Sequence, residues 1–159
     1  MMKTGFKALD EALNIKENKL IILVCKPTVE RLLKTNIADD IKKQNIPVVI
    51  FSFVKLERIL NRSRQLKSRT GIKLILIDDL ISITTNSFYF MGEGDIKSII
   101  IQQLKELSIQ LDIPIIVTAP TNLDKKQFNE NPIKALDFFC KSEKVKEYVD
   151  KIIFLEEGQ

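Results

Sequence analysis

The stretch that decides the fold reads Leu20-Ile21-Ile22-Leu23-Val24-Cys25-Lys26-Pro27-Thr28-Val29-Glu30-Arg31-Leu32-Leu33. Its first part, residues 20–24, is apolar and largely β-branched, which predicts a strand buried on both faces. Pro27 ends that strand, and a helical pattern begins at Glu30. A strand, a short turn and a helix N-terminus in this order commonly bind a phosphate. The stretch therefore has the layout of a nucleotide pocket.

The turn lacks the residues of a working phosphate loop. Such a loop reads G-x-x-x-x-G-K-[ST], but its closing positions here hold Glu30, Arg31 and Leu32. The carboxylate of Glu30 repels phosphate where glycine would let the backbone approach. Arg31 keeps a positive charge, although its planar fork is not equivalent to a lysine ammonium. Leu32 has no hydroxyl to hold Mg²⁺, so we expect no bound nucleotide.

Composition places the chain among ordinary globular proteins. At 159 residues, with 45% hydrophobic and 29% charged residues, it has the length of one domain. The net charge of +4 allows a polyanionic partner without requiring one. The chain has no histidine, so the common Cys/His zinc patterns and a histidine general base are excluded, and Cys25 and Cys140 are expected to be buried apolar residues. Without a signal peptide or a bilayer-spanning apolar run, we expect a cytoplasmic protein with no membrane partner.

The remaining periodicities predict alternating strands and helices. We expect a capped turn or short helix within residues 3–18, strands at 20–24, 48–53, 73–79, 113–117 and 151–155, helices at 30–43, 55–68 and 95–111, a polar loop at 119–132, and a helical or irregular stretch at 133–149. Asp95 is expected to cap the long helix, and Thr70-Gly71 to end the helix before the third strand. This alternation predicts an α/β fold with a mainly parallel sheet of about five strands and helices on both faces.

Several segments match one known pattern in a single collinear order. They are residues 4–10 (T-G-F-K-A-L-D), 20–27, 66–78, 104–116 and 150–155. Together they resemble the RecA-like C-terminal domain of the DnaB-type replicative helicase family. The resemblance implies a RecA-like three-layer sandwich and a single domain over residues 1–159. It also implies a segment shortened between Ser52 and Asp78 and a chain that ends before the family's arginine-finger region.

The resemblance also implies which catalytic groups are lost. The glutamate that polarises the attacking water corresponds to Val54, and the glutamine that senses the γ-phosphate corresponds to Pro120. Asp78 keeps the Walker B carboxylate, which we expect to serve structure and not metal binding. The vestigial nucleotide-site positions are Lys26, Thr28, Arg31 and Asp78. We expect no cofactor; weak binding of ATP and Mg²⁺ is the alternative.

Nucleic-acid contact is expected, by the same resemblance, from the loops after the third and fourth strands. Their candidate residues are Phe88, Tyr89, Lys125 and Lys126. Aromatic rings beside lysines can stack bases and neutralise phosphates. Packing of Phe88 and Phe90, at alternate positions, under their own loop is the alternative. The basic helix at 55–68 is a second candidate surface, or else a solvated face or a site of protein docking.

Three hypotheses about function follow. The first is a non-catalytic module, a pseudo-ATPase linked to DNA replication that binds a replicative helicase, a loader, another replication protein or single-stranded DNA. The second is a residual nucleotide-binding, DNA-stimulated ATPase or helicase subunit. The third is a chain that still folds but has lost its role. Binding of ATP with Mg²⁺ and of single-stranded DNA distinguishes them.

Overall fold

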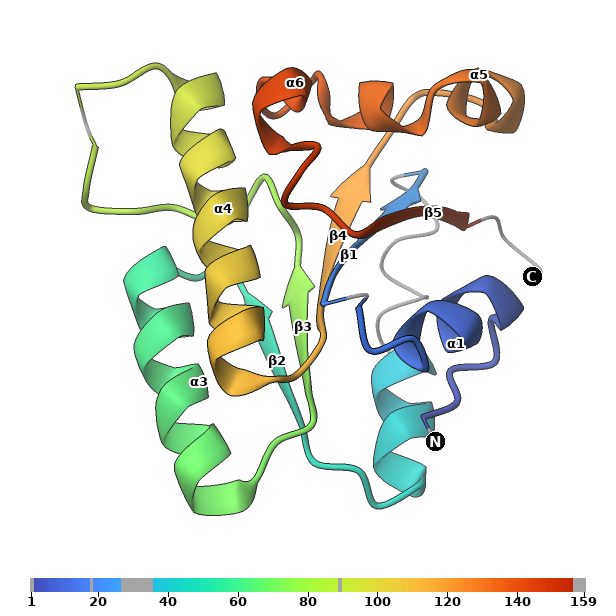
Figure 1. Cartoon of the computed structure of the whole chain (residues 1–159), viewed down its shortest axis with the longest axis vertical. Helices are drawn as coiled ribbons and strands as arrows, with labels where there is room; N and C mark the ends of the chain where they lie inside the picture. Colours follow the sequence, from blue (N-terminus) through green and yellow to red (C-terminus); the bar gives the residue numbers. More distant parts are fainter. Residues whose placement is uncertain (1, 18, 27–35, 89, 156–159) are drawn as a thin grey trace.

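The computed structural model describes residues 2–17, 19–26, 36–88 and 90–155 (Figure 1). The described strands are β1 (Leu20–Cys25), β2 (Val48–Ser52), β3 (Leu74–Asp78), β4 (Ile115–Pro120) and β5 (Lys151–Leu155). They form one five-stranded sheet in the order β2-β3-β4-β1-β5, and every pairing is parallel. The expected parallel α/β sheet is confirmed. Because all strands run the same way, their carboxyl ends meet at one edge.

Strand β1 is interior to the sheet, as its composition predicts. It pairs with β4 on one side, Leu20 beside Ile115, and with β5 on the other, Ile21 beside Lys151. All six of its residues are buried. Alternate side chains enter two separate hydrophobic clusters, one on each face of the sheet. A strand covered on both faces has no solvent side, and a continuous apolar run satisfies that requirement.

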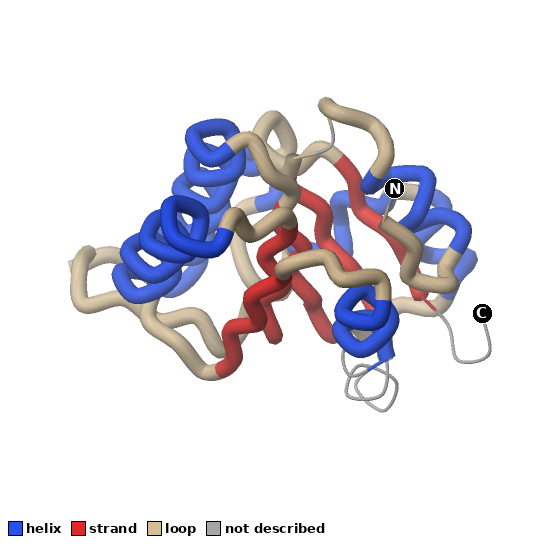
Figure 2. Tube along the Cα trace, turned by 90° about the horizontal axis from the view of Figure 1, so that it is seen from below, coloured by secondary structure: helices blue, strands red, loops and turns tan. Residues whose placement is uncertain are grey.

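Helices cover both faces of the sheet, so the fold has three layers (Figure 2). On one face lie α3 (Leu56–Thr70) and α4 (Glu93–Leu111), whose apolar residues share a cluster with alternate residues of β1, β3 and β4. On the other face lie α1 (Lys7–Leu13) and the helical residues 36–43. The expected helix at 30–43 is confirmed for residues 36–43; its first part lies outside the described residues.

The segment before α1 explains part of the sequence pattern. The Oδ1 atom of Asp10 accepts hydrogen bonds from the backbone N of Thr4 (2.6 Å) and from the Thr4 hydroxyl (2.7 Å). Between them Gly5 has φ of 90°, a conformation that glycine adopts without strain. The Thr4 hydroxyl also accepts from the backbone N of Phe6 (3.2 Å). Thr4 therefore caps a turn and joins it to α1.

Helix α3 ends as expected. Gly71 has φ of 64°, and its backbone N donates a hydrogen bond to the carbonyl of Leu66 (3.1 Å). This left-handed cap satisfies a carbonyl that the last turn leaves open. Glycine is favoured because a Cβ in this conformation meets its own backbone.

Two local expectations were wrong. Helix α4 begins at Glu93 with Gly92 as its N-cap, so Asp95 lies inside the first turn, where its carboxylate pairs with Lys141 and Lys144. The stretch expected as a polar loop contains the end of β4 and the helix α5 (Lys125–Glu130). A capping box starts α5: Gln127 N donates to Asp124 Oδ1 (2.8 Å), and Asp124 N donates to Gln127 Oε1 (2.9 Å).

The stretch after α5 is helical in two short pieces. They are η1 (Pro132–Leu136), a 3₁₀ turn, and α6 (Ser142–Val145). With α5 they lie above the carboxyl edge near β4 (Figure 1). In the described part of the chain, none of the helices is long and apolar enough to cross a bilayer.

Candidate functional site at the carboxyl edge of the sheet

The described vestigial nucleotide positions lie at the carboxyl edge. Lys26 follows the last residue of β1 and is exposed, and Asp78 is the last residue of β3. Strand β4 separates β1 from β3, so these two residues do not come from adjacent strands. Thr28 and Arg31 lie outside the described residues. The structure thus brings Lys26 and Asp78 to one edge without pairing their strands.

The two acids at the end of β3, Asp78 and Asp79, accept hydrogen bonds from neighbouring polar groups. Asp78 Oδ1 accepts a long hydrogen bond from the Thr118 hydroxyl (3.4 Å). Asp79 Oδ1 accepts from both the backbone N (2.9 Å) and the hydroxyl (3.0 Å) of Ser82. Such a bond from an aspartate to a backbone N–H three residues later closes a turn. Asp79 therefore shapes the turn that follows β3.

A buried lysine donates hydrogen bonds to the backbone of the same turn. Lys97, on α4, is 4% exposed, and its Nζ donates to the carbonyls of Ile81 (2.8 Å) and Ile83 (2.5 Å). Burial lowers the pKa of Lys97 below its ordinary value, although the charges of Glu93 and Asp79 oppose that shift. Sequence reasoning missed this residue. The available signal was its spacing, because position 97 is four residues before the buried Ile101 and shares its helix face.

The two positions that the resemblance singles out, Val54 and Pro120, carry apolar side chains. Val54 is 8% exposed and belongs to the same hydrophobic cluster as Leu56 and Ile59. Pro120 is the last residue of β4, beside Cys25 of β1. Neither side chain can accept or donate a proton or hydrogen bond. These two positions of the edge therefore offer no group for activating water or sensing phosphate.

Glu57, the acid nearest to Val54 in sequence, accepts hydrogen bonds from the loop that follows β3. Its Oε1 accepts from the Thr85 hydroxyl (2.5 Å) and from the backbone N of Asn86 (3.1 Å). Its Oε2 is buried and has no hydrogen-bond partner among the described residues. Burial acts to raise the pKa of Glu57, but the bonds from Thr85 and Asn86 and the charge of Lys55 outweigh it, so the pKa is lowered. The ionised carboxylate ties the start of α3 to the loop after β3.

Metal ligands do not gather at this edge. Within the described residues, no group of three or more His, Cys, Asp and Glu side chains could hold a metal ion. Cys25 and Cys140 are both buried and are not joined in a disulfide, and burial together with the charge of Asp137 raises the pKa of the Cys140 thiol to about 11. The thiol of Cys140 is therefore protonated at neutral pH.

The candidate nucleic-acid residues do not form one cluster. Phe88 is half-buried and has φ of 62°, while Tyr89 lies outside the described residues. Lys125 and Lys126 are exposed in the first turn of α5. The loop before α4 and helix α5 lie on opposite sides of the upper part of the molecule in Figure 1. A strand stacked on the loop would have to cross the whole edge to reach these lysines.

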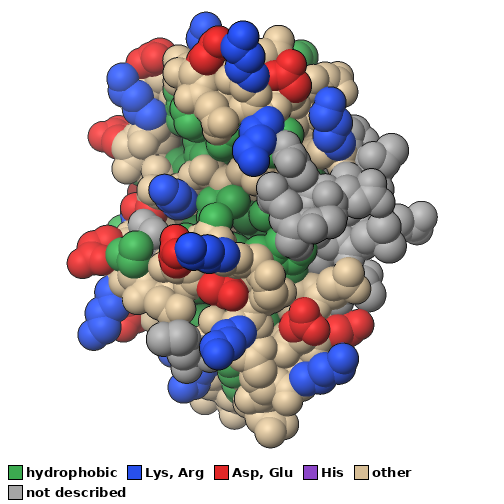
Figure 3. Space-filling model, turned by 90° about the vertical axis from the view of Figure 1, so that its right-hand side faces the viewer, with side chains coloured by type: hydrophobic (Ala, Val, Ile, Leu, Met, Phe, Trp, Pro, Cys, Tyr) green, Lys and Arg blue, Asp and Glu red, His purple; other side chains and the backbone are tan. Residues whose placement is uncertain are grey.

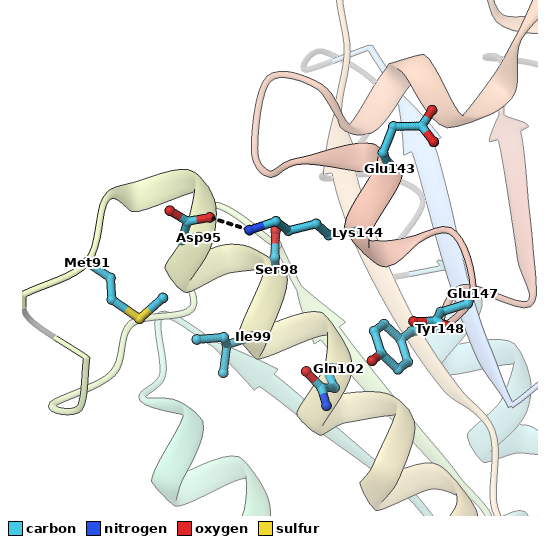
Figure 4. Close-up of a pocket in the computed structure, with 9 residues that line it drawn as sticks. All are labelled: Met91, Asp95, Ser98, Ile99, Gln102, Glu143, Lys144, Glu147 and Tyr148. Carbon is cyan, nitrogen blue, oxygen red and sulfur yellow. Dashed lines mark hydrogen bonds and ion pairs between the residues drawn. The ribbon is translucent and has the colours of Figure 1, made fainter.

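A pocket of about 350 Å³ lies between α4 and α6, away from these residues (Figure 4). The side chain of Lys144 extends across it toward Asp95, with Nζ 3.3 Å from the carboxylate Oδ1. Hydrogen bonds from Lys144 and Lys141 lower the pKa of Asp95. The two ion pairs connect the segment that begins α6 to the first turn of α4.

Comparison with known proteins supports the fold at low sequence identity. No protein-family model matches the chain, and no curated protein matches it. Among solved structures, a DnaB-like replicative helicase, described with its interactions with primase, matches with a TM-score of 0.77 and 14% identity over 99% of this chain. A second structure, of an ATPase domain, matches with a TM-score of 0.67 and 12% identity over 98%, and the DnaC helicase loader with 0.53 and 14% over 94%.

These matches differ in how much of the known protein they cover. The chain spans about half, 52%, of the helicase chain, 76% of the ATPase-domain chain and 86% of the loader. Structural similarity at identities this low shows that the backbone fold is shared. It does not show that the activity is shared. The expectation of a RecA-like sandwich is confirmed, because nearly the whole chain superposes on these domains. The chain has the RecA-like fold of DnaB-like helicase ATPase domains.

Proposed function

We propose that the protein is a non-catalytic RecA-fold module, a pseudo-ATPase that acts by binding in DNA replication. The observation that carries this proposal is the pair of apolar residues at the carboxyl edge. Val54 is packed in the core and Pro120 ends β4, where the helicase family would place its water-activating glutamate and phosphate-sensing glutamine. Phosphoryl transfer depends on such positioned polar groups. Without them, the fold is better suited to docking than to hydrolysis.

The acids that remain at the edge support the same proposal. Asp79 already accepts two hydrogen bonds from Ser82 within its own turn, and Asp78 accepts a long bond of 3.4 Å from Thr118 of the neighbouring strand β4. Carboxylates engaged in this way are less suited to the near-ideal octahedral geometry of Mg²⁺. We assign both acids to structure.

The proposed partners are a replicative helicase, its loader or another replication protein, with single-stranded DNA as a further ligand. Support comes from what the structural neighbours are: a replicative helicase studied with primase, and a helicase loader. A module without ATP chemistry can still bind such partners through its surface. This role implies a cytoplasmic location.

Nucleotide binding is tested by thermal unfolding. A ligand at a hundred times its Kd stabilises the folded state by about 2.7 kcal/mol, which raises the Tm of a domain this size by about 5–10 °C. We expect no such rise with ATP or a slowly hydrolysed analogue plus Mg²⁺. A rise that disappears in the Asp78→Asn variant would contradict the proposal and support the residual ATPase instead.

DNA binding by the loops is tested separately. We expect a labelled oligothymidylate to bind with an affinity that falls with salt. Phe88→Ala should weaken binding by removing a stacking surface, and Lys125→Ala should reduce the salt dependence if α5 contacts phosphate. Binding to DNA that neither change affects would exclude these loops. In that case the module would act through protein partners or through another surface.

A further inference from the structure

The positive charge of the chain is concentrated on one helix. Helix α3 contains one acid, Glu57, and five basic residues: Arg58, Arg62, Arg64, Lys67 and Arg69. Its net charge of +4 equals that of the whole chain, so the remaining residues contain as many acids as bases. Four of the five arginines of the chain lie on α3. On the face shown in Figure 3, by contrast, side chains of both signs are interspersed.

Three of these arginines form a row. Arg58, Arg62 and Arg69 are exposed and are separated by four and seven residues, which places them on one face of a helix. At 1.5 Å per residue the row is about 16 Å long. The buried side of α3 carries Leu56 and Ile59, at other helical angles. The row therefore faces away from the core along almost the full helix.

The charges of this row are not neutralised within the described part of the chain. No ion pair there involves a basic residue of α3. Arg62 contacts the neutral Gln65 at 3.4 Å, and Arg64 contacts the neutral Gln110 at 3.3 Å. The only acid of the helix, Glu57, accepts its hydrogen bonds from Thr85 and Asn86. A row of arginines without acids attracts an anionic partner.

The chemistry of the row favours phosphates over a protein partner. The exposed large hydrophobic residues of the described chain all lie outside α3: Ile15, Ile50, Phe53, Ile81, Phe90, Ile109 and Phe138. Protein interfaces depend on buried aromatic or aliphatic anchors, which this face lacks. Phosphodiester binding needs none, because charge and the planar guanidinium fork supply the interaction.

The row also lies next to the loop between β3 and α4 that contains Phe88 and Phe90, which we call the aromatic loop. The backbone N of Leu56, the first residue of α3, donates to the carbonyl of Thr84 (2.7 Å), and Glu57 holds Thr85 and Asn86. Phe90, in the same loop, is 78% exposed. Figure 1 shows α3 and this loop on the same side of the molecule, away from α5. A strand could therefore stack on the loop and continue along α3.

We propose that Arg58, Arg62 and Arg69 bind the phosphodiester backbone of single-stranded nucleic acid. The surface on α3 takes the place of Lys125 and Lys126 as the basic partner of the aromatic loop. This inference rests on the proposed function only in placing the protein beside DNA. It does not depend on whether the nucleotide site is lost. Because the contacts are to phosphates, binding is independent of base sequence.

The test compares two triple variants with the same change in charge. The first carries Arg58→Gln, Arg62→Gln and Arg69→Gln. The matched control changes three exposed lysines on the opposite face of the sheet, Lys7→Gln, Lys42→Gln and Lys43→Gln. A third variant replaces the same arginines with lysine and so keeps the charge. Binding of a labelled oligothymidylate is measured against salt for all four proteins, with the Tm of each checked first.

The expected result is a smaller salt dependence for the arginine-to-glutamine variant alone. Losing three phosphate contacts lowers the slope of log K against log salt by about 2, so the wild type loses about fifteenfold more affinity than the variant between about 50 and 200 mM salt. The lysine variant should keep the wild-type slope. An equal loss in the control variant, or an unchanged slope in the glutamine variant, would overturn the proposal.

Two further outcomes would also overturn it. Preferential binding of poly-aspartate over oligothymidylate by the wild type would assign the row to an acidic protein. Complete absence of DNA binding by the wild type would exclude the arginine row as a nucleic-acid-binding surface. Neither outcome changes the nucleotide test, so a failure of this inference and a failure of the pseudo-ATPase proposal are distinguishable.

Discussion

The ammonium of Lys105 lies 2.5 Å from the carboxylate of Asp150 and connects α4 to the start of β5. The same oxygen, Asp150 Oδ2, accepts hydrogen bonds from the backbone N of Lys19 (2.9 Å) and of Leu20 (2.8 Å) at the start of β1. The two paired side chains are only 14% and 19% exposed. One carboxylate thus joins a helix and two strands at the amino edge of the sheet, opposite the candidate site.

Removing this carboxylate should destabilise the fold. Asp150→Ala leaves the Lys105 ammonium and two backbone N–H groups without their acceptor, and we expect a loss of about 2–3 kcal/mol. Lys105→Met is the matched comparison, since Asp150 then keeps both backbone donors, and we expect a smaller loss. Urea unfolding measures both. Equal losses in the two variants would show that the backbone bonds contribute little.

Lys97→Met should loosen the turn after β3. The methionine fills the same space but cannot donate to the carbonyls of Ile81 and Ile83, so we expect a loss of about 1–2 kcal/mol at neutral pH. Faster amide exchange in residues 80–84 should accompany the loss. Gln103→Met, at a half-buried position of the same helix, is a control that leaves both of these bonds in place.

The same variant has a pH dependence of defined sign. Because the folded-state pKa of Lys97 is lowered from 10.5, the unfolded chain binds more protons in the window between the folded pKa and 10.5. The free energy of unfolding of the wild type therefore gains a contribution that rises with pH in that window. The difference between wild type and Lys97→Met should grow accordingly. A constant difference up to pH 10.5 would contradict the assigned burial of the ammonium.

Ser63→Ala should leave the protein as stable or make it more stable. Ser63 is 0% exposed on α3, and its Oγ has no hydrogen-bond partner among the described residues. A buried hydroxyl without a partner costs free energy that alanine does not, and alanine has the higher helix propensity. We expect a gain of up to about 1 kcal/mol in urea unfolding. A loss of more than about 1 kcal/mol would indicate a hydrogen bond that this arrangement does not contain.

Local patterns predict most of the backbone. The buried strand at residues 20–24, the alternation of strands and helices and the glycine that ends α3 all depend on neighbours in sequence, and each agrees with the structure. The capping box of α5, Asp124 with Gln127, is equally local, but its helix of six residues is too short to show a periodicity. Aspartate suits an N-cap, which favours Asp95 on residue type alone, but Gly92 three residues earlier begins the helix.

The amino-acid sequence was enough to predict the parallel sheet, the interior strand β1 and the apolar character of positions 54 and 120. These depend on residue type and order along the chain. Which polar groups contact one another depends on the packing of the elements. Three hydrogen bonds join residues distant in sequence: Lys19 at the start of β1 donates to Asp150, Lys97 donates to the turn after β3, and Thr85 donates to Glu57. Periodicity describes one element at a time, whereas a long-range hydrogen bond depends on how elements pack. For that reason the sequence indicated the basic helix α3, whereas its contact with the loop before α4 became evident only in the fold.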